Sequence, residues 1–116
     1  FKQVNDTYGH REGDAVLLAV VEAMRSVLGP ADLLGRYGGD EFIAVLPDLD
    51  AEAARALGAK LLEAVRARRS TAGARPTCSL GVAELAPAMK AEDLVAAADR
   101  ALYAAKAAGR DRVAGG

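Results

Sequence analysis

The sequence predicts an α/β sandwich in which helices flank a small central sheet built around an antiparallel hairpin. Three stretches carry apolar residues at helical spacing, and two short apolar runs flank a Gly-Gly-Asp sequence, which is typical of a hairpin. The resulting order is helix, strand, strand, helix, strand, helix. The chain begins at Phe1 as if within a structured segment, so we expect that a first strand of the fold precedes it.

The first half contains the first helix and the hairpin. Residues 14–28 carry a helical stripe, and Gly29-Pro30 supplies a stop. Residues 33–37 and 41–46 are the predicted strands of the hairpin. Apolar residues occupy both faces of the second strand, so we expect that strand to be buried on both sides.

The second half contains two helices and a strand. Asp50 is placed to cap a helix that ends near Arg66, Arg68 and Arg69, where basic side chains oppose the helix dipole. A loop at 70–76 precedes a strand at 77–85, and an alanine-rich helix follows at 93–108. The positions expected to face inward on that helix are Leu94, Ala98, Ala101, Leu102 and Ala105.

Composition limits the function. The 116 residues, 52% of them hydrophobic, are enough for one core, so we expect a single domain over residues 1–116. Fifteen basic and sixteen acidic residues give a net charge of −1, which argues against a nucleic acid or a membrane surface as partner. The single cysteine, Cys78, cannot form an intrachain disulfide, and the chain shows no signal peptide or spanning segment; both favour the cytoplasm.

The hairpin tip is the strongest candidate site. Gly38 and Gly39 can adopt positive φ and let a bulky polyanion approach the backbone. The adjacent carboxylates of Asp40 and Glu41 would repel phosphates unless a divalent cation lay between, so the combination indicates Mg²⁺ and a nucleotide. The alternative is a plain turn with a solvated Glu.

Two further segments carry polar candidates. The sequence FKQVNDTYGHREGD at 1–14 offers Asn5, which can both donate and accept, and Asp14, a pure acceptor that suits the donor edge of guanine better than the N1 acceptor of adenine. Asp14 could instead be a helix N-cap, and Asn5 and His10 could make local turn hydrogen bonds. Lys106 and Arg110 are four residues apart, which would place them on one helical face to grip a triphosphate, or else simply at a solvated helix C-terminus.

Taken together, these segments resemble the GGDEF family of diguanylate cyclases. The resemblance runs from residue 1 to 110 through four motifs in family order: FKxVNDxxGHxxGD, RYGGDEF, SLGVA and ADRALYAAKxxGR. It implies a fold similar to nucleotide cyclases and the polymerase palm. The central sheet of that fold is mostly antiparallel and flanked by helices.

The resemblance also implies roles for the residues. Asn5 and Asp14 would recognise guanine with support from His10, and Phe1 and Lys2 would lie where the backbone meets the β- and γ-phosphates. Gly38 and Gly39 would also border the substrate, and Lys106 and Arg110 would hold the terminal phosphates. Asp40 and Glu41 would bind Mg²⁺ or Mn²⁺ and act in catalysis, with Asp40 as the presumed general base.

The reaction implied is the condensation of two GTP molecules into cyclic di-GMP with release of two pyrophosphates. Each domain of this family holds one GTP, so the active form is expected to be a two-fold homodimer. Such domains are usually fused to an upstream sensory or receiver domain.

The sequence departs from the family in two ways. The family's inhibitory RxxD motif aligns with Gly29 and Asp32, so we expect no useful product binding there, because the planar cation is absent. A further metal-binding Asp would precede Phe1, so we expect the isolated 116-residue chain to be weakly active or inactive. Asp111 stands where the family usually has Asn.

Other functions are compatible with these residues. One is a catalytically lapsed GGDEF domain that binds GTP or signals through partner contacts. Another is a nucleotidyl cyclase or palm-like enzyme with a different product. An Asp at the upstream metal position would favour the active enzyme over the lapsed domain, and comparing GTP with ATP as substrate would identify the product class.

Overall fold

The computed structural model describes residues 9–69, 73 and 75–115. The chain divides into two compact units, Phe1–Pro47 with Glu63–Pro76 and Asp48–Leu62 with Thr77–Gly116. The first unit contains helix α2 and strands β1 and β2, and the second contains β3, α4 and β4. Helix α3 begins in the second unit, and its last residues belong to the first.

Helix α2, His10–Val27, begins four residues before the predicted start at residue 14. Gly9, with φ 90°, is the N-cap residue, and the Gly13 N–H donates to its carbonyl at 3.0 Å. The helix buries Gly13, Val16 and Ala23, and it ends before Gly29 as expected. Asp14 therefore lies inside the helix, so the N-cap interpretation of Asp14 is wrong.

Strands β1, Leu33–Arg36, and β2, Phe42–Val45, form the predicted antiparallel hairpin. The register places Arg36 opposite Phe42 next to the turn and Leu33 opposite Val45 at the far end. Burial of β2 on both faces was a wrong expectation, because Ala44 is exposed on one face and Val45, 50% exposed, on the other. Among the described residues β2 pairs only with β1, and a two-stranded ribbon does not cover both of its own faces.

Helix α3, Ala51–Arg66, is capped as predicted by Asp50, whose Oδ1 accepts the Ala53 N–H at 2.8 Å. Glu84 adds a second cap from far along the sequence by accepting the Ala51 N–H. The helix buries Leu61, Leu62 and Val65. At the other end Arg69 donates to the carbonyls of Arg66 and Arg68, so a basic side chain satisfies the C-terminal carbonyls.

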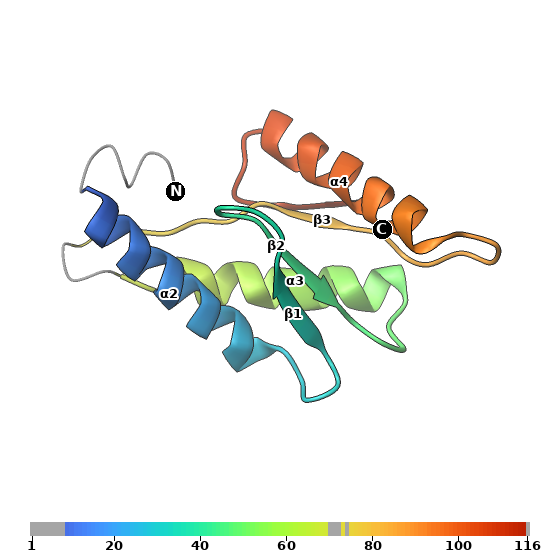
Figure 1. Cartoon of the computed structure of the whole chain (residues 1–116), viewed down its shortest axis with the longest axis horizontal. Coiled ribbons are helices and arrows are strands. Elements are labelled where there is room, and N and C mark those ends of the chain that lie inside the picture. Colours follow the sequence, from blue (N-terminus) through green and yellow to red (C-terminus); the bar gives the residue numbers. More distant parts are fainter. Residues whose placement is uncertain (1–8, 70–72, 74, 116) are drawn as a thin grey trace. The chain divides into compact units, whose positions relative to one another are not determined.

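In the second unit, β3, Leu80–Val82, and β4, Val113–Gly115, pair in parallel and are joined through α4, Ala91–Ala107. The predicted strand at 77–85 is therefore shorter than expected, and β4 was not predicted. Figure 1 shows α4 lying along β3. The inward positions predicted for α4 are confirmed, with Ala105 fully buried and the other four half-buried.

Gly81 of β3 lies directly against the backbone of α4. A Cβ at this position would lie 2.8 Å from the Cα of Leu102 and closer still to the Leu102 amide nitrogen and the Ala98 carbonyl oxygen. Because these are backbone atoms of a helix, no side-chain rotation can relieve the clash. Glycine here sets the distance at which the helix packs on the strand.

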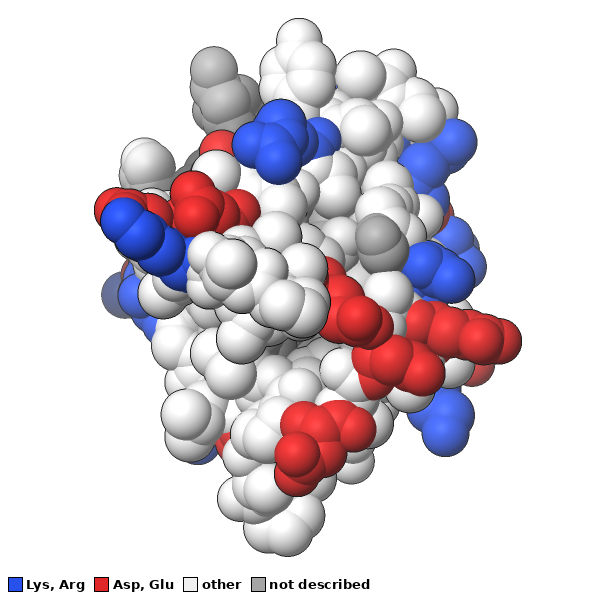
Figure 2. All heavy atoms as spheres, turned by 90° about the vertical axis from the view of Figure 1, so that its right-hand side faces the viewer, with Lys and Arg blue, Asp and Glu red and all other residues white. Residues whose placement is uncertain are grey.

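The α/β class predicted from the sequence is confirmed, with three helices, one antiparallel and one parallel two-stranded sheet in the described part of the chain, and α4 packed on the parallel one. The face drawn in Figure 2 carries both acidic and basic side chains, in keeping with the nearly balanced charge. No helix within the described ranges is long and apolar enough to cross a membrane.

Candidate functional site

The hairpin tip is a short turn closed by backbone hydrogen bonds. The N–H groups of Tyr37 and Gly38 both donate to the Glu41 carbonyl, at 2.8 and 3.2 Å. Arg36 adds side-chain bonds from the end of β1: its Nε donates to the Gly38 carbonyl at 3.2 Å, and its terminal nitrogen donates to the Gly39 carbonyl. One guanidinium thus binds both glycine carbonyls of the signature turn.

Neither glycine of the turn needs its special backbone freedom, so that part of the sequence argument was wrong. Neither Gly38 nor Gly39 has a positive φ, and a Cβ at Gly39 would have no neighbour within 4 Å. At Gly39 the missing side chain leaves the backbone uncovered, whereas Gly38 lies against the Glu41 side chain. A bulky anionic ligand can therefore approach the Gly39 backbone closely.

Asp40 and Glu41 are both exposed at this tip. The Glu41 side chain folds back over the turn, since a Cβ at Gly38 would lie 3.5 Å from its Oε2. Two adjacent carboxylates supply hard oxygen donors of the kind Mg²⁺ prefers. Among the residues the structure describes, no group of three His, Cys, Asp or Glu is arranged to hold a metal, and Asp40 and Glu41 are two adjacent carboxylates.

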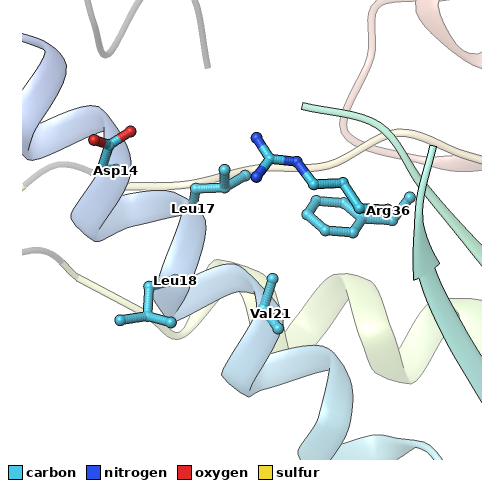
Figure 3. A pocket seen from close by; sticks show the side chains of 6 residues that line it. Asp14, Leu17, Leu18, Val21 and Arg36 are labelled. Carbon is cyan, nitrogen blue, oxygen red and sulfur yellow. The ribbon is translucent and has the colours of Figure 1, made fainter. Parts of the chain in front are cut away.

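A pocket of about 430 Å³ lies between α2 and the hairpin within the first unit. Its lining combines a carboxylate, a guanidinium and apolar side chains: Asp14, Leu17, Leu18, Val21, Arg36 and Phe42. In Figure 3 the guanidinium of Arg36 extends toward Leu17, and Asp14 lies nearly one turn earlier on the same helix. Apolar walls with a carboxylate suit a flat ring that has a donor edge.

Of the candidates near the start of the chain, the structure describes His10 and Asp14. His10 and Asp14 are exposed on the first turns of α2, and a spacing of four residues puts them on one helical face. Of these two, Asp14 lines the pocket. Phe1, Lys2 and Asn5 lie outside the described residues.

Lys106 and Arg110 are both exposed, but they do not share a helical face as predicted. The Gly109 N–H donates to the Lys106 carbonyl at 3.3 Å, and the Arg110 N–H donates to the Ala105 carbonyl at 2.9 Å. This pair of bonds is a Schellman motif with glycine at the C′ position, where φ is 118°. Arg110 therefore lies beyond the end of α4, in the reversing turn.

The chain stays left-handed after Gly109, with φ 62° at Arg110 and 51° at Asp111. The Asp111 N–H donates to the Ser79 Oγ at 3.2 Å, which ties this turn to the residue before β3. Asn and Asp are the residues other than glycine that best tolerate such a backbone. The departure from the family's Asn at position 111 is thus conformationally neutral.

Of the candidate residues, Asp14, Asp40 and Glu41 are in the first unit, and Lys106 and Arg110 are in the second. The sequence did not point to Arg36 or Ser79, whose side chains bind backbone groups: Arg36 the glycine carbonyls of the turn, and Ser79 the Asp111 N–H. Arg36 could have been noticed, because it lies just before a short turn whose carbonyls have few backbone partners of their own.

Known proteins resemble this chain along nearly all of its length. The family model described as "Diguanylate cyclase, GGDEF domain" matches residues 1–112. Diguanylate cyclase DgcP of Pseudomonas aeruginosa is 40% identical over 116 residues, which cover 97% of this chain and 17% of that protein. Diguanylate cyclase DgcS of Shewanella oneidensis is 39% identical over 111 residues, covering 96% of this chain and 37% of that protein. The chain thus spans less than half the length of either relative.

Solved structures agree with this likeness. The GGDEF domain of DgcB from Caulobacter crescentus, in complex with c-di-GMP, gives a TM-score of 0.90 at 33% identity, covering 97% of this chain and 70% of that one. Diguanylate cyclase SiaD from Pseudomonas aeruginosa, in complex with its activator SiaC, gives 0.88 at 40% identity, covering 97% and 44%. With a family model matching residues 1–112 and a hairpin tip that keeps the signature residues, this chain belongs to the diguanylate cyclase GGDEF domain family.

Proposed function

We propose that the protein carrying this domain condenses two molecules of GTP into cyclic di-GMP and two pyrophosphates. The observation that carries the proposal is the hairpin tip, where Asp40 and Glu41 stand exposed beside an uncovered glycine backbone. The family match and the relatives named diguanylate cyclase support the same reaction.

Each residue group has a proposed role. Asp14 accepts hydrogen bonds from the N1–H and amino group of guanine, with Asn5 and His10 assisting and Leu17 contacting the ring. Phe1, Lys2, Gly38 and Gly39 border the phosphates. Lys106 and Arg110 neutralise the terminal phosphates, Arg110 by a bidentate fork. The reacting centre is then left to Asp40 and Glu41.

We propose that Asp40 and Glu41 form part of the site for a divalent metal, Mg²⁺ or Mn²⁺, on which the family depends. When bound, such an ion polarises the phosphate and lowers the pKa of a hydroxyl. Asp40 accepts the proton of a 3′-hydroxyl, whose oxygen then bonds to the α-phosphorus of the second GTP while the bond to pyrophosphate breaks. The same step repeated with the roles exchanged closes the ring.

This chemistry requires two GTP molecules in opposite orientation, so we propose a two-fold homodimer as the active form, with one GTP on each domain. We further propose a cytoplasmic protein, because that compartment supplies GTP, and an upstream sensory or receiver domain that sets dimer formation.

The test is turnover by the full-length protein with Mg²⁺ and either GTP or ATP. We expect cyclic di-GMP and two pyrophosphates for each product from GTP, and no cyclic product from ATP, because the N1 of adenine is an acceptor that Asp14 would repel. GTP binding without turnover would favour a catalytically lapsed domain. Conversion of ATP would identify a cyclase with another product.

The inhibitory position gives a separate prediction. The Asp32 carboxylate accepts the Gly29 N–H at 2.7 Å, and the Asp32 N–H donates to the Gly29 carbonyl at 3.1 Å, so Asp32 closes this turn. We expect that cyclic di-GMP does not bind here, because position 29 of the motif is glycine and not the arginine that would pair with a phosphate. Gly29→Arg should introduce binding, since a Cβ there meets only Asp32 at an ordinary 3.4 Å.

Calorimetry with cyclic di-GMP decides the matter. We expect the wild type and Asp32→Ala to give the same isotherm, and Gly29→Arg to gain a binding event. A binding event that is present in the wild type and lost in Asp32→Ala would contradict the prediction.

A further inference from the structure

We infer that Arg36 is a positioning residue for catalysis: its guanidinium fixes the orientation of the Gly38 and Gly39 peptides and thereby aims the carboxylates that follow them. This inference rests on the proposed function. It assigns Arg36 a role within its own hairpin, through backbone carbonyls.

The geometry is specific to an arginine. Nε donates to the Gly38 carbonyl at 3.2 Å, and a terminal nitrogen donates to the carbonyl of the next residue, Gly39. Two N–H donors of one rigid, planar guanidinium bind the carbonyls of two adjacent peptides. Neither peptide can therefore rotate without breaking a hydrogen bond. A lysine at this position would offer three donors on a freely rotating ammonium, without the fixed spacing and plane of the guanidinium.

The turn needs such support because its sequence supplies little of its own. Gly38 and Gly39 have no side chains, and a Cβ at Gly39 would meet nothing within 4 Å, so packing does not restrain that peptide. Glycine has more accessible backbone conformations than any other residue. The tip is held by the two N–H bonds to the Glu41 carbonyl and the two bonds that Arg36 donates to the glycine carbonyls.

The backbone of this turn sets the direction in which the Asp40 and Glu41 side chains point. The Gly39 carbonyl belongs to the peptide that leads into Asp40, so fixing its plane fixes one backbone torsion beside that residue. Glu41 is held on the other side, through its carbonyl, by Tyr37 and Gly38. Loss of Arg36 would leave both carboxylates in place but allow Asp40 to sample directions that do not serve the reaction.

Arg36 also borders the pocket that contains Asp14, so its side chain runs from that pocket to the turn. A role in binding the base would raise KM for GTP when Arg36 is removed. A positioning role would lower kcat instead, because the substrate still binds while the catalytic carboxylate is misdirected. Steady-state kinetics therefore separates the two.

The experiment compares Arg36→Ala, Arg36→Lys and Arg25→Ala in the full-length protein. Arg25 is an exposed arginine in the last turn of α2, in the same unit, and serves as the control. We expect Arg36→Ala to lower kcat about 10–100-fold, as loss of a supporting hydrogen-bond partner does elsewhere, with KM changed less than about threefold. Arg36→Lys should fall between, and Arg25→Ala should match the wild type.

Backbone ¹⁵N relaxation gives a second readout that does not need turnover. We expect lower order parameters at Gly39 and Asp40 in Arg36→Ala than in the wild type or Arg25→Ala, and an unchanged α2. A kcat equal to that of the control, or a rise in KM alone, would overturn the inference, as would unchanged relaxation at the tip. If the wild type makes no product from GTP, the proposed function fails while the relaxation comparison still decides the role of Arg36.

Discussion

Asp40→Asn should lower kcat for cyclic di-GMP formation by about 10²–10⁴-fold, the usual contribution of a general base. The substitution keeps the shape of the side chain and removes both its charge and its ability to accept the hydroxyl proton. Because Asp40 is exposed at the hairpin tip, the fold should be unaffected, and the thermal midpoint should stay close to that of the wild type.

The matched control is Asp48→Asn. Asp48 is also exposed, and its φ of 64° lies in the region that Asn tolerates as well as Asp does, so neither stability nor turnover should change. Pyrophosphate release measured on both variants gives the comparison. Full activity in Asp40→Asn would remove Asp40 from the catalytic machinery and leave Glu41 as the remaining candidate in the turn.

Gly81→Ala is expected to have the largest effect on stability. The added methyl would overlap the backbone of α4 at Ala98 and Leu102, so the helix must move off the strand. Overpacking of this kind usually costs about 1–3 kcal/mol, and a backbone obstacle places the loss toward the upper end. Urea denaturation should show a lower midpoint with an unchanged m value.

Gly35→Ala controls for the change of residue type. Gly35 is on β1, outside the residues with positive φ, and a Cβ there would meet nothing within 4 Å. Its replacement should be neutral or stabilise by about 0.4–1 kcal/mol through the unfolded chain. Equal midpoints for the two variants would show that α4 can shift without penalty.

The sequence predicted the elements whose signals are local. The apolar stripes identified α2, α3 and α4, and Asp50 caps α3 as expected. Gly-Gly-Asp between two apolar runs was enough to identify the hairpin. In each case the evidence for the element lies within a few residues of it, where propensity and periodicity act.

The features that were missed depend on partners distant in sequence or on backbone detail. Strand β4 has only three residues, and it is a strand because Leu80 and its neighbours pair with it in parallel. Capping of α3 by Glu84 and support of Asp111 by Ser79 join residues more than thirty positions apart. No periodicity in the sequence encodes such contacts.

For the candidate site, the sequence predicted residue types better than geometry. Asp14, Asp40 and Glu41 are exposed in the described structure, and their roles stay predictions. The reversal of the chain at Gly109 was recognised only as a helix end, so Lys106 and Arg110 were wrongly placed on one face. Arg36 was overlooked because it binds backbone carbonyls, and a search for chemically reactive side chains does not consider backbone groups.

At residue 110, in the left-handed turn after α4, the backbone conformation favours glycine, whereas the proposed phosphate-binding role requires a cationic side chain. Arg110 has φ 62°, a backbone that disfavours any residue with a Cβ by roughly 1–2 kcal/mol and that glycine adopts freely. Selection for stability alone would favour glycine, whereas a triphosphate-binding role favours the long cationic side chain. Drift at position 110 should therefore run toward glycine in descendants of this domain that no longer bind nucleotide, and the loss would make them more stable.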